Sequence, residues 1–196
     1  AVGTQGEGRP AAPRRGRSRK TSQRDRRLAA SLVELANALA RGQTTTLADG
    51  RTMGKIELLV EALRHNPKLA WAYLFLGLTL TSGETVTLPD GRSLGARQLY
   101  VEALRHNVTL AWAYEDLAAS LLPGELVTLS DGRRLVARQL FVEAVRHDAK
   151  LASAYVSLAG LLSSGETVAL SDGRTLDARE LYVEALRHHP AYAAAC

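Results

Sequence analysis

The sequence repeats itself every 41 residues, and this period constrains the fold more than any other feature. The octapeptide at 58–65, Leu-Leu-Val-Glu-Ala-Leu-Arg-His, recurs with small changes at 99–106, 140–147 and 181–188. An Asp-Gly-Arg triplet keeps the same step, with copies at 49–51, 90–92, 131–133 and 172–174. Because two motifs share one period, we expect four stacked copies of a single supersecondary unit.

Each unit contains two apolar patterns with the spacing of a helix. The first, at 69–81, places Ala72, Tyr73, Leu76, Gly77 and Leu80 on one stripe. The second, at 94–107, places Ala96, Leu99, Tyr100, Ala103 and Leu104 on one stripe. Such spacing predicts helices that pack along one face. We expect Thr52, Ser93 and Thr175 to cap the second helices of their units.

The segment between the two helices predicts a tight β-turn or a miniature hairpin. Its β-branched run ends in Asp-Gly, a dipeptide that suits a sharp chain reversal. A ribbon this small needs support, which we expect from Leu88, Leu94 and their counterparts. The Asp-Gly-Arg triplet is interpreted as turn chemistry with the arginine in solvent. The alternative is a row of arginines that docks an acidic partner.

This pattern resembles the tetratricopeptide repeat, with Sel1-like repeats as a near alternative. The matching positions are Tyr73, Leu76, Gly77 and Leu80, then Ala96 and Tyr100, then Pro67 or Pro190 at the end of a unit. The extra residues, relative to the family's unit of about 34, fall in the turn. The resemblance implies an all-α protein, a right-handed α/α solenoid with short β-turn or hairpin insertions. Its units would be 28–67, 68–108, 109–149 and 150–190, and 191–196 would open a truncated fifth repeat in a chain that continues.

The resemblance also implies a partner-binding groove lined by the first helices. Counting from Tyr73 places nine residues there: Trp71, Leu74, Leu78, Trp112, Glu115, Ala119, Ser153, Val156 and Gly160. Two tryptophans one period apart would be credible hot spots. The alternative is that both pack against a neighbouring helix. Of the Lys and Asn set with which some relatives hold a C-terminal carboxylate, only Asn37 matches, so a partly apolar peptide or helix is the expected partner.

The N-terminal arm, 1–27, differs in character from the repeats. It holds nine Arg or Lys residues against Glu7 and Asp25, a charge of +7, and lacks large apolar side chains. We expect it to be disordered. A second hypothesis is therefore binding to nucleic acid, as in a ribonucleoprotein, by phosphate neutralisation. The residues would be Arg14, Arg15, Arg17, Arg19, Lys20, Arg24, Arg26 and Arg27. A solvated tail is the alternative.

Nothing in the sequence predicts an enzyme, a cofactor or a small-molecule substrate. The histidines at 65, 106, 147 and 188 form a ladder whose rungs lie about 10 Å apart, too far to share one metal ion. They are expected near helix C-termini. The adjacent pair His188-His189 is only a weak candidate for a metal site. Cys196 is the single cysteine and no apolar run would span a membrane. We expect an intracellular protein, cytoplasmic or nuclear, with an organelle as a further possibility.

Overall fold

The computed structural model describes residues 21–190, and this part of the chain contains eight helices and four strand pairs. The helices are α1 (Gln23–Ala38), α2 (Lys55–His65), α3 (Ala70–Thr79), α4 (Ala96–His106), α5 (Ala111–Ala119), α6 (Ala137–His147), α7 (Ala152–Gly160) and α8 (Ala178–His188). The strands are β1 (Thr44–Thr46), β2 (Thr52–Gly54), β3 (Thr85–Thr87), β4 (Ser93–Gly95), β5 (Val127–Thr128), β6 (Arg134–Leu135), β7 (Thr167–Ala169) and β8 (Thr175–Asp177). A helix, a hairpin and a second helix thus recur four times.

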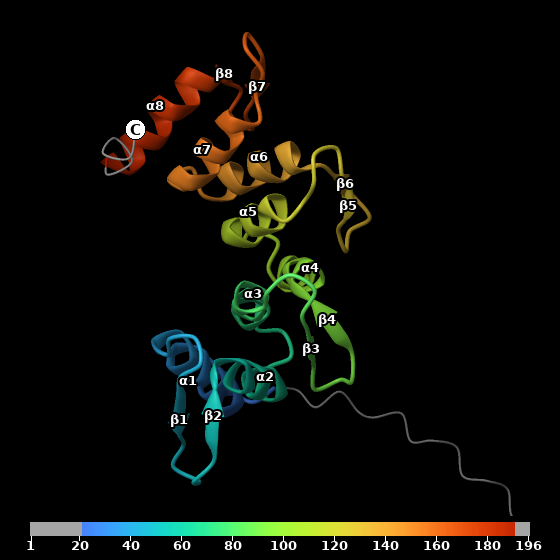
Figure 1. Ribbon diagram of the computed structural model, residues 1–196, viewed down its shortest axis with the longest axis vertical. Coiled ribbons are helices and arrows are strands. Elements are labelled where there is room, and N and C mark those ends of the chain that lie inside the picture. The colour runs from blue at the N-terminus through green and yellow to red at the C-terminus, as the bar shows by residue number, and fades with distance from the viewer. Residues whose placement is uncertain (1–20, 191–196) are drawn as a thin grey trace, which may run out of the picture.

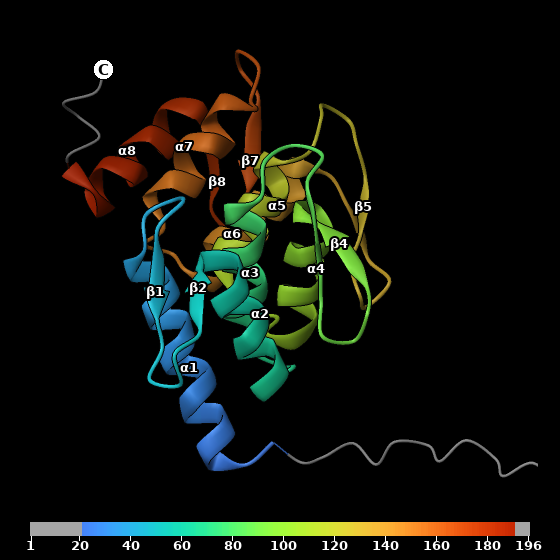
Figure 2. The same ribbon diagram turned by 60° about the horizontal axis from the view of Figure 1, so that its bottom comes forward.

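The units contact one another in chain order. Within a unit the two helices pack together, as α3 does on α4. Between units, the second helix contacts the next first helix, as α2 does α3. The first helices α1 and α3 also touch, as do α3 and α5. The helix pairs follow one another along the long axis from α1 to α8, and the hairpins project from them (Figure 1; Figure 2). The expected helix-rich fold with antiparallel strand pairs between helices is confirmed.

Small and large apolar side chains alternate in a core that runs through all four units. Alanines that are fully buried let the helices approach closely, at positions 62, 72, 103, 113, 144 and 154. Leu58, Leu99 and Leu140 are also fully buried. The backbone of Gly77 lies directly against the ring of Tyr100, because a Cβ atom added at Gly77 would lie 2.4 Å from Cε1 of Tyr100. The core therefore follows the predicted stripes.

The Asp-Gly-Arg triplets form the hairpin turns. Each central glycine has φ between 85° and 88°, the left-handed region that a side chain would strain. In the second unit, Asp90 Oδ1 accepts a hydrogen bond from the backbone N–H of Arg92 at 3.0 Å. Leu88 and Leu94 are 3% and 9% exposed, so they anchor the hairpin on the helices as expected.

Two predicted boundaries were wrong. The helix α1 begins at Gln23, with Ser22 as N-cap, so 23–27 are helical rather than part of a disordered arm. The expected caps Thr52, Ser93 and Thr175 lie in strands instead. Strand pairing extends two residues further than expected, and Gly54, Gly95 and Asp177 take the N-cap positions. The expectations for 1–20 and 191–196 fall outside the described residues.

Candidate partner-binding surface

An ion network clamps every hairpin to its second helix. In the second unit the Arg92 guanidinium donates to Asp90 Oδ2 at 2.8 Å and to Glu102 Oε1 at 2.7 Å. The same pairs recur around Arg51, Arg133 and Arg174. These arginines are exposed as expected, by 41–50% of the side chain, and each guanidinium is also paired, because the hairpin folds back against the helix. Their guanidiniums are engaged within the unit, which weakens the idea of an arginine row for acidic partners.

The carboxylates of the turns are held ionised by this arrangement. The backbone N–H and guanidinium of the arginine two residues on donate to Asp49, Asp131 and Asp172, and lower the pKa of each below its usual value. The predicted Glu–Arg pairs three residues apart are also present, as in Glu184 and Arg187 at 2.8 Å. These charged groups are therefore paired with one another and stabilise the unit.

The histidine ladder lies at the C-termini of the second helices, as expected. His106, His147 and His188 stack on tyrosines of the first helices, with ring centroids 5.3–6.0 Å apart. Burial lowers the pKa of His106 and of His147, which favours the neutral ring. Across residues 21–190, no three His, Cys, Asp or Glu side chains gather as metal ligands would. The ladder is a packing feature between the two helices.

The residues predicted to line a groove separate into exposed and buried sets. Trp71, Leu78 and Trp112 are 40%, 50% and 49% exposed, and Ala119 and Gly160 are also exposed. Ser153 and Val156 are half-buried. Leu74 and Glu115 are buried, at 1% and 9% exposure, so their assignment to an open surface was wrong. They occupy the same position in successive units, which packs into the core.

The exposed and half-buried members form one row on consecutive first helices, which we call the first-helix surface. It comprises Trp71 and Leu78 on α3, Trp112 and Ala119 on α5, and Ser153, Val156 and Gly160 on α7. Trp71 stacks on Phe75 of its own helix, with centroids 5.5 Å apart. Both indoles nevertheless keep large exposed areas, more than packing on a neighbouring helix would leave. Exposed aromatic rings on a rigid helix are typical of protein-binding surfaces.

A charged bridge joins consecutive units and was missed in the sequence analysis. Arg97 on α4 donates to Glu125 Oε1 at 2.5 Å and to the carbonyl oxygen of Ser120, both in the next unit. Arg138 on α6 repeats this with Glu166 at 2.6 Å and the carbonyl oxygen of Leu161 at 3.3 Å. The signal was present, because these arginines and glutamates also keep the 41-residue step.

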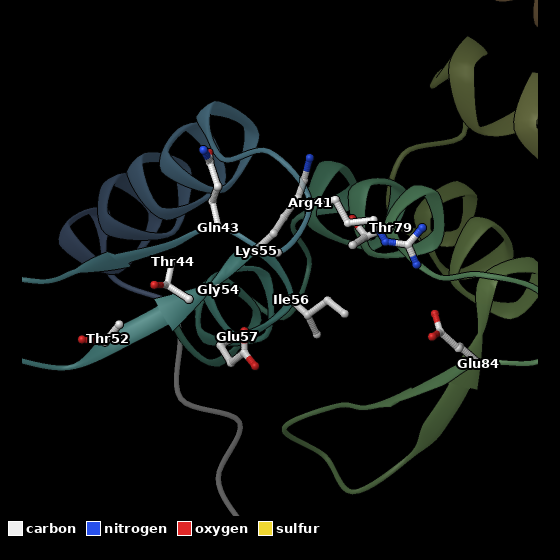
Figure 3. A pocket seen from close by; sticks show the side chains of 11 residues that line it. Arg41, Gln43, Thr44, Thr52, Gly54, Lys55, Ile56, Glu57, Thr79 and Glu84 are labelled. Carbon is white, nitrogen blue, oxygen red and sulfur yellow. The ribbon is translucent and has the colours of Figure 1, made fainter.

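The first junction lacks this bridge. Ile56 occupies the arginine position, and Glu84 lies on the far side of a cleft of about 490 Å³ (Figure 3). Lys55 lines the same cleft beside Ile56 on α2, and Arg41 and Thr79 line it from other segments. A similar cleft at the second junction, about 590 Å³, contains Arg97. The clefts mark where units meet, and the first contains no counterpart of the Arg97 bridge.

We expect Ile56→Arg to stabilise the chain and Arg138→Ala to destabilise it. The new arginine would reach Glu84 and the turn carbonyl as Arg97 reaches their counterparts, for about 0.5–1 kcal/mol at this partly exposed position. Loss of Arg138 removes charged hydrogen bonds and should cost about 1–2 kcal/mol. Urea unfolding followed by circular dichroism measures both. If the Ile56→Arg chain is less stable than the wild type, and the Ile56→Lys chain is equally destabilised, the bridge geometry would be contradicted.

Comparison with protein-family models and with curated protein sequences finds no match to this chain. Within residues 21–190, the structure contains no helix of the length and apolarity that crossing a bilayer requires.

Proposed function

We propose that this chain is a non-catalytic protein-interaction scaffold that binds a peptide or helix of a partner protein on the first-helix surface. In this proposal the four units form a right-handed α/α solenoid of the tetratricopeptide-like class, with Sel1-like repeats as the near alternative. The observation that carries the proposal is the exposure of Trp71, Leu78 and Trp112 on successive first helices.

The distribution of charge supports an apolar contact at this surface. The arginines and acids of the clamps are paired in every unit, and those of the bridges are paired at the second and third junctions. Glu115, the one acid predicted to lie in the groove, is buried, and burial raises its pKa. The first-helix surface therefore offers two indoles, an isobutyl group and small side chains. Such a surface favours a partner segment with apolar anchors at helical or extended spacing.

The Trp71→Ala/Trp112→Ala double variant should lose at least tenfold in partner affinity and remain folded. Truncating a buried aromatic hot spot typically costs 2 kcal/mol or more. Affinity capture from cell extract, quantified by mass spectrometry, identifies the bound proteins, and titration of each purified protein gives the affinity. Leu122→Ala/Leu126→Ala is the matched control, because these side chains are 69% and 48% exposed outside the helices. Equal binding by the folded tryptophan variant would refute the surface assignment.

Nucleic-acid binding through the basic arm is a second candidate. Arg24, Arg26 and Arg27 are exposed on the first turns of α1, where they extend the charge of the preceding arm. We expect deletion of 1–20 to weaken binding to a poly(U) RNA at least tenfold, measured by fluorescence anisotropy. The full chain should show a steep salt dependence that the deletion flattens. Unchanged affinity and slope would eliminate this candidate, and the tryptophan variant should bind RNA as the wild type does.

A further inference from the structure

The junction between the third and fourth units is apolar where the junction before it is polar. At the second junction, hydroxyl side chains from both units line the cleft: Thr81, Thr85 and Ser120. One period further along the chain, the same positions carry leucines that are 69%, 48% and 42% exposed: Leu122, Leu126 and Leu161. Leucines this exposed and gathered at one junction form an apolar patch of the kind that marks an interaction site.

The charged bridge between these units places the leucines together. Arg138 donates to Glu166 and to the carbonyl oxygen of Leu161, which repeats the contacts of Arg97 at the second junction. The turn of the third unit and the end of α7 therefore meet as the equivalent segments do one unit earlier. The leucines form what we call the third-junction surface: Leu122, Leu126 and Leu161. Helices α5 and α6 precede this surface and α7 and α8 follow it, so it lies within the stack and not at one of its ends.

An arginine stands on the same face of the third hairpin as Leu126. Thr128 follows Leu126 by two residues, and Thr128 lies directly opposite Arg134 in the strand pair, so the three share the outer face. The other units carry small hydroxyl side chains at the position of Arg134: Thr52, Ser93 and Thr175. Arg134 is exposed, and no carboxylate among residues 21–190 pairs with it. Its charge is therefore available to an acidic group of a partner.

The size of the third-junction surface favours a short segment over a second folded copy as its occupant. Three leucines exposed to this extent offer roughly a few hundred Å² of apolar area. A stable contact between two folded chains buries about 800 Å² on each of them. Within the described chain, β5 and β6 pair only with each other, so each keeps an open edge. An extended segment can add to such an edge as a further strand.

We propose that the third-junction surface binds an extended segment of a second partner protein. In this segment, apolar side chains at alternate positions contact the three leucines, and a carboxylate at the next alternate position pairs with Arg134. The inference goes beyond the proposed function, because the occupant is not the partner of the first-helix surface. The two surfaces share no residue. The Leu122→Ala/Leu126→Ala chain should therefore keep the partner of the first-helix surface and lose this one.

Leucine-methyl NMR with a synthetic peptide tests the proposal. The probe is Ac-Glu-Thr-Leu-Thr-Leu-Thr-Glu-NH2, which places its leucines and glutamates on one face of an extended strand. It is titrated into the full chain carrying ¹³C-labelled leucine methyl groups. We expect saturable shifts at Leu122, Leu126 and Leu161, with Leu78 unchanged. The Leu122→Thr/Leu126→Thr chain should bind at least fivefold more weakly, and it should fold, because the second unit carries threonine at both positions.

A charge swap separates this recognition from unspecific apolar contact. A probe with lysine in place of both glutamates should bind at least threefold more weakly, and Arg134→Glu should reverse the order of the two probes. The Trp71→Ala/Trp112→Ala chain should bind the probe as the wild type does, so failure of one surface is distinguishable from failure of the other. No shift at millimolar probe, or equal binding by Leu122→Thr/Leu126→Thr, would overturn the proposal. So would a wild-type dimer in light scattering that this variant abolishes, since a second copy would then be the occupant.

Discussion

Replacing Asp116 by Asn should stabilise the folded chain by about 1–3 kcal/mol at pH 7.5. Asp116 lies on α5, at the contact between the second and third units. It is near Tyr100 on α4, whose pKa is raised to about 12 by burial and, to a smaller extent, by the charge of Asp116. Its Oδ2 atom is buried without a hydrogen-bond partner. A carboxylate in such a place loses hydration that nothing replaces, so the charged form is unfavourable.

The same environment makes the effect depend on pH. Burial, assisted by the neighbouring Glu115 carboxylate, raises the pKa of Asp116 from 3.8 to about 6. When the pKa of a carboxyl is higher in the folded chain than in the unfolded chain, the folded chain binds the proton more tightly. This stabilises the fold fully below the unfolded-state pKa, and the stabilisation is lost as the pH rises through the folded-state pKa. The stability of the wild type should therefore fall between about pH 4 and pH 7 through this group.

Urea unfolding of both chains from pH 4 to pH 8 measures this prediction. The free-energy difference between Asp116→Asn and wild type should be near zero at pH 4 and reach its full size above pH 7. Because groups remote from Asp116 titrate alike in both chains, the difference isolates Asp116 together with Glu115, whose carboxyl is coupled to it. Glu34→Gln is the matched control, since Glu34 is the exposed counterpart on α1, and it should change stability by less than about 0.5 kcal/mol. A destabilising Asp116→Asn, or a difference that does not vary with pH, would contradict the account.

Gly77→Ala should destabilise the chain by about 1–3 kcal/mol, although helix propensity alone favours Ala over Gly by about 1 kcal/mol. The added methyl group would lie 2.4 Å from the Tyr100 ring, which is itself 6% exposed and confined. The other units carry Ala36, Ala118 and Ala159 at this position. Since Ala118 and Ala159 stand opposite Phe141 and Tyr182, the penalty belongs to the present placement of the Tyr100 ring against Gly77 and not to the position or to an aromatic partner as such.

A double-mutant cycle with Tyr100→Leu tests this pairing. In the first unit, Ala36 coexists with Leu59, the counterpart of Tyr100. Tyr100→Leu alone should destabilise the chain by leaving a cavity, whereas Gly77→Ala added to it should be neutral or stabilising. A coupling of at least 1 kcal/mol is expected from urea titrations. Additive effects, or a Gly77→Ala chain more stable than wild type, would show that the ring moves aside at no cost.

Much of the fold could be predicted because the same motifs occur in all four units, so each unit supports the interpretation of the others. Four copies of Asp-Gly-Arg fixed the turns, and the stripe that contains Leu99 and Leu104 marked the buried face of the second helix. The caps could not be predicted, because Ser93 satisfies a cap rule in isolation while strand pairing with Thr87 takes precedence. Local rules name suitable residues, and tertiary pairing decides between them.

The candidate site was predictable only in part, and the errors have a physical cause. Counting positions from Tyr73 placed Glu115 in an open groove. Its counterparts Leu74 and Val156 are apolar, which was the available sign that this position faces the core. The exposure of Trp71 could not be read from the sequence, since tryptophan on an apolar helix is as suited to the interior as to an interface.

Site-specific photocrosslinking tests the central claim most directly. A photoreactive phenylalanine analogue is placed at Leu78, on the first-helix surface, or at Leu126, which has nearly the same exposure but lies outside the helices. With partner protein present, position 78 should yield a crosslinked product that Trp71→Ala/Trp112→Ala removes, and position 126 should yield little. Crosslinking from 126 that matches or exceeds crosslinking from 78, with no effect of the tryptophans, would contradict it.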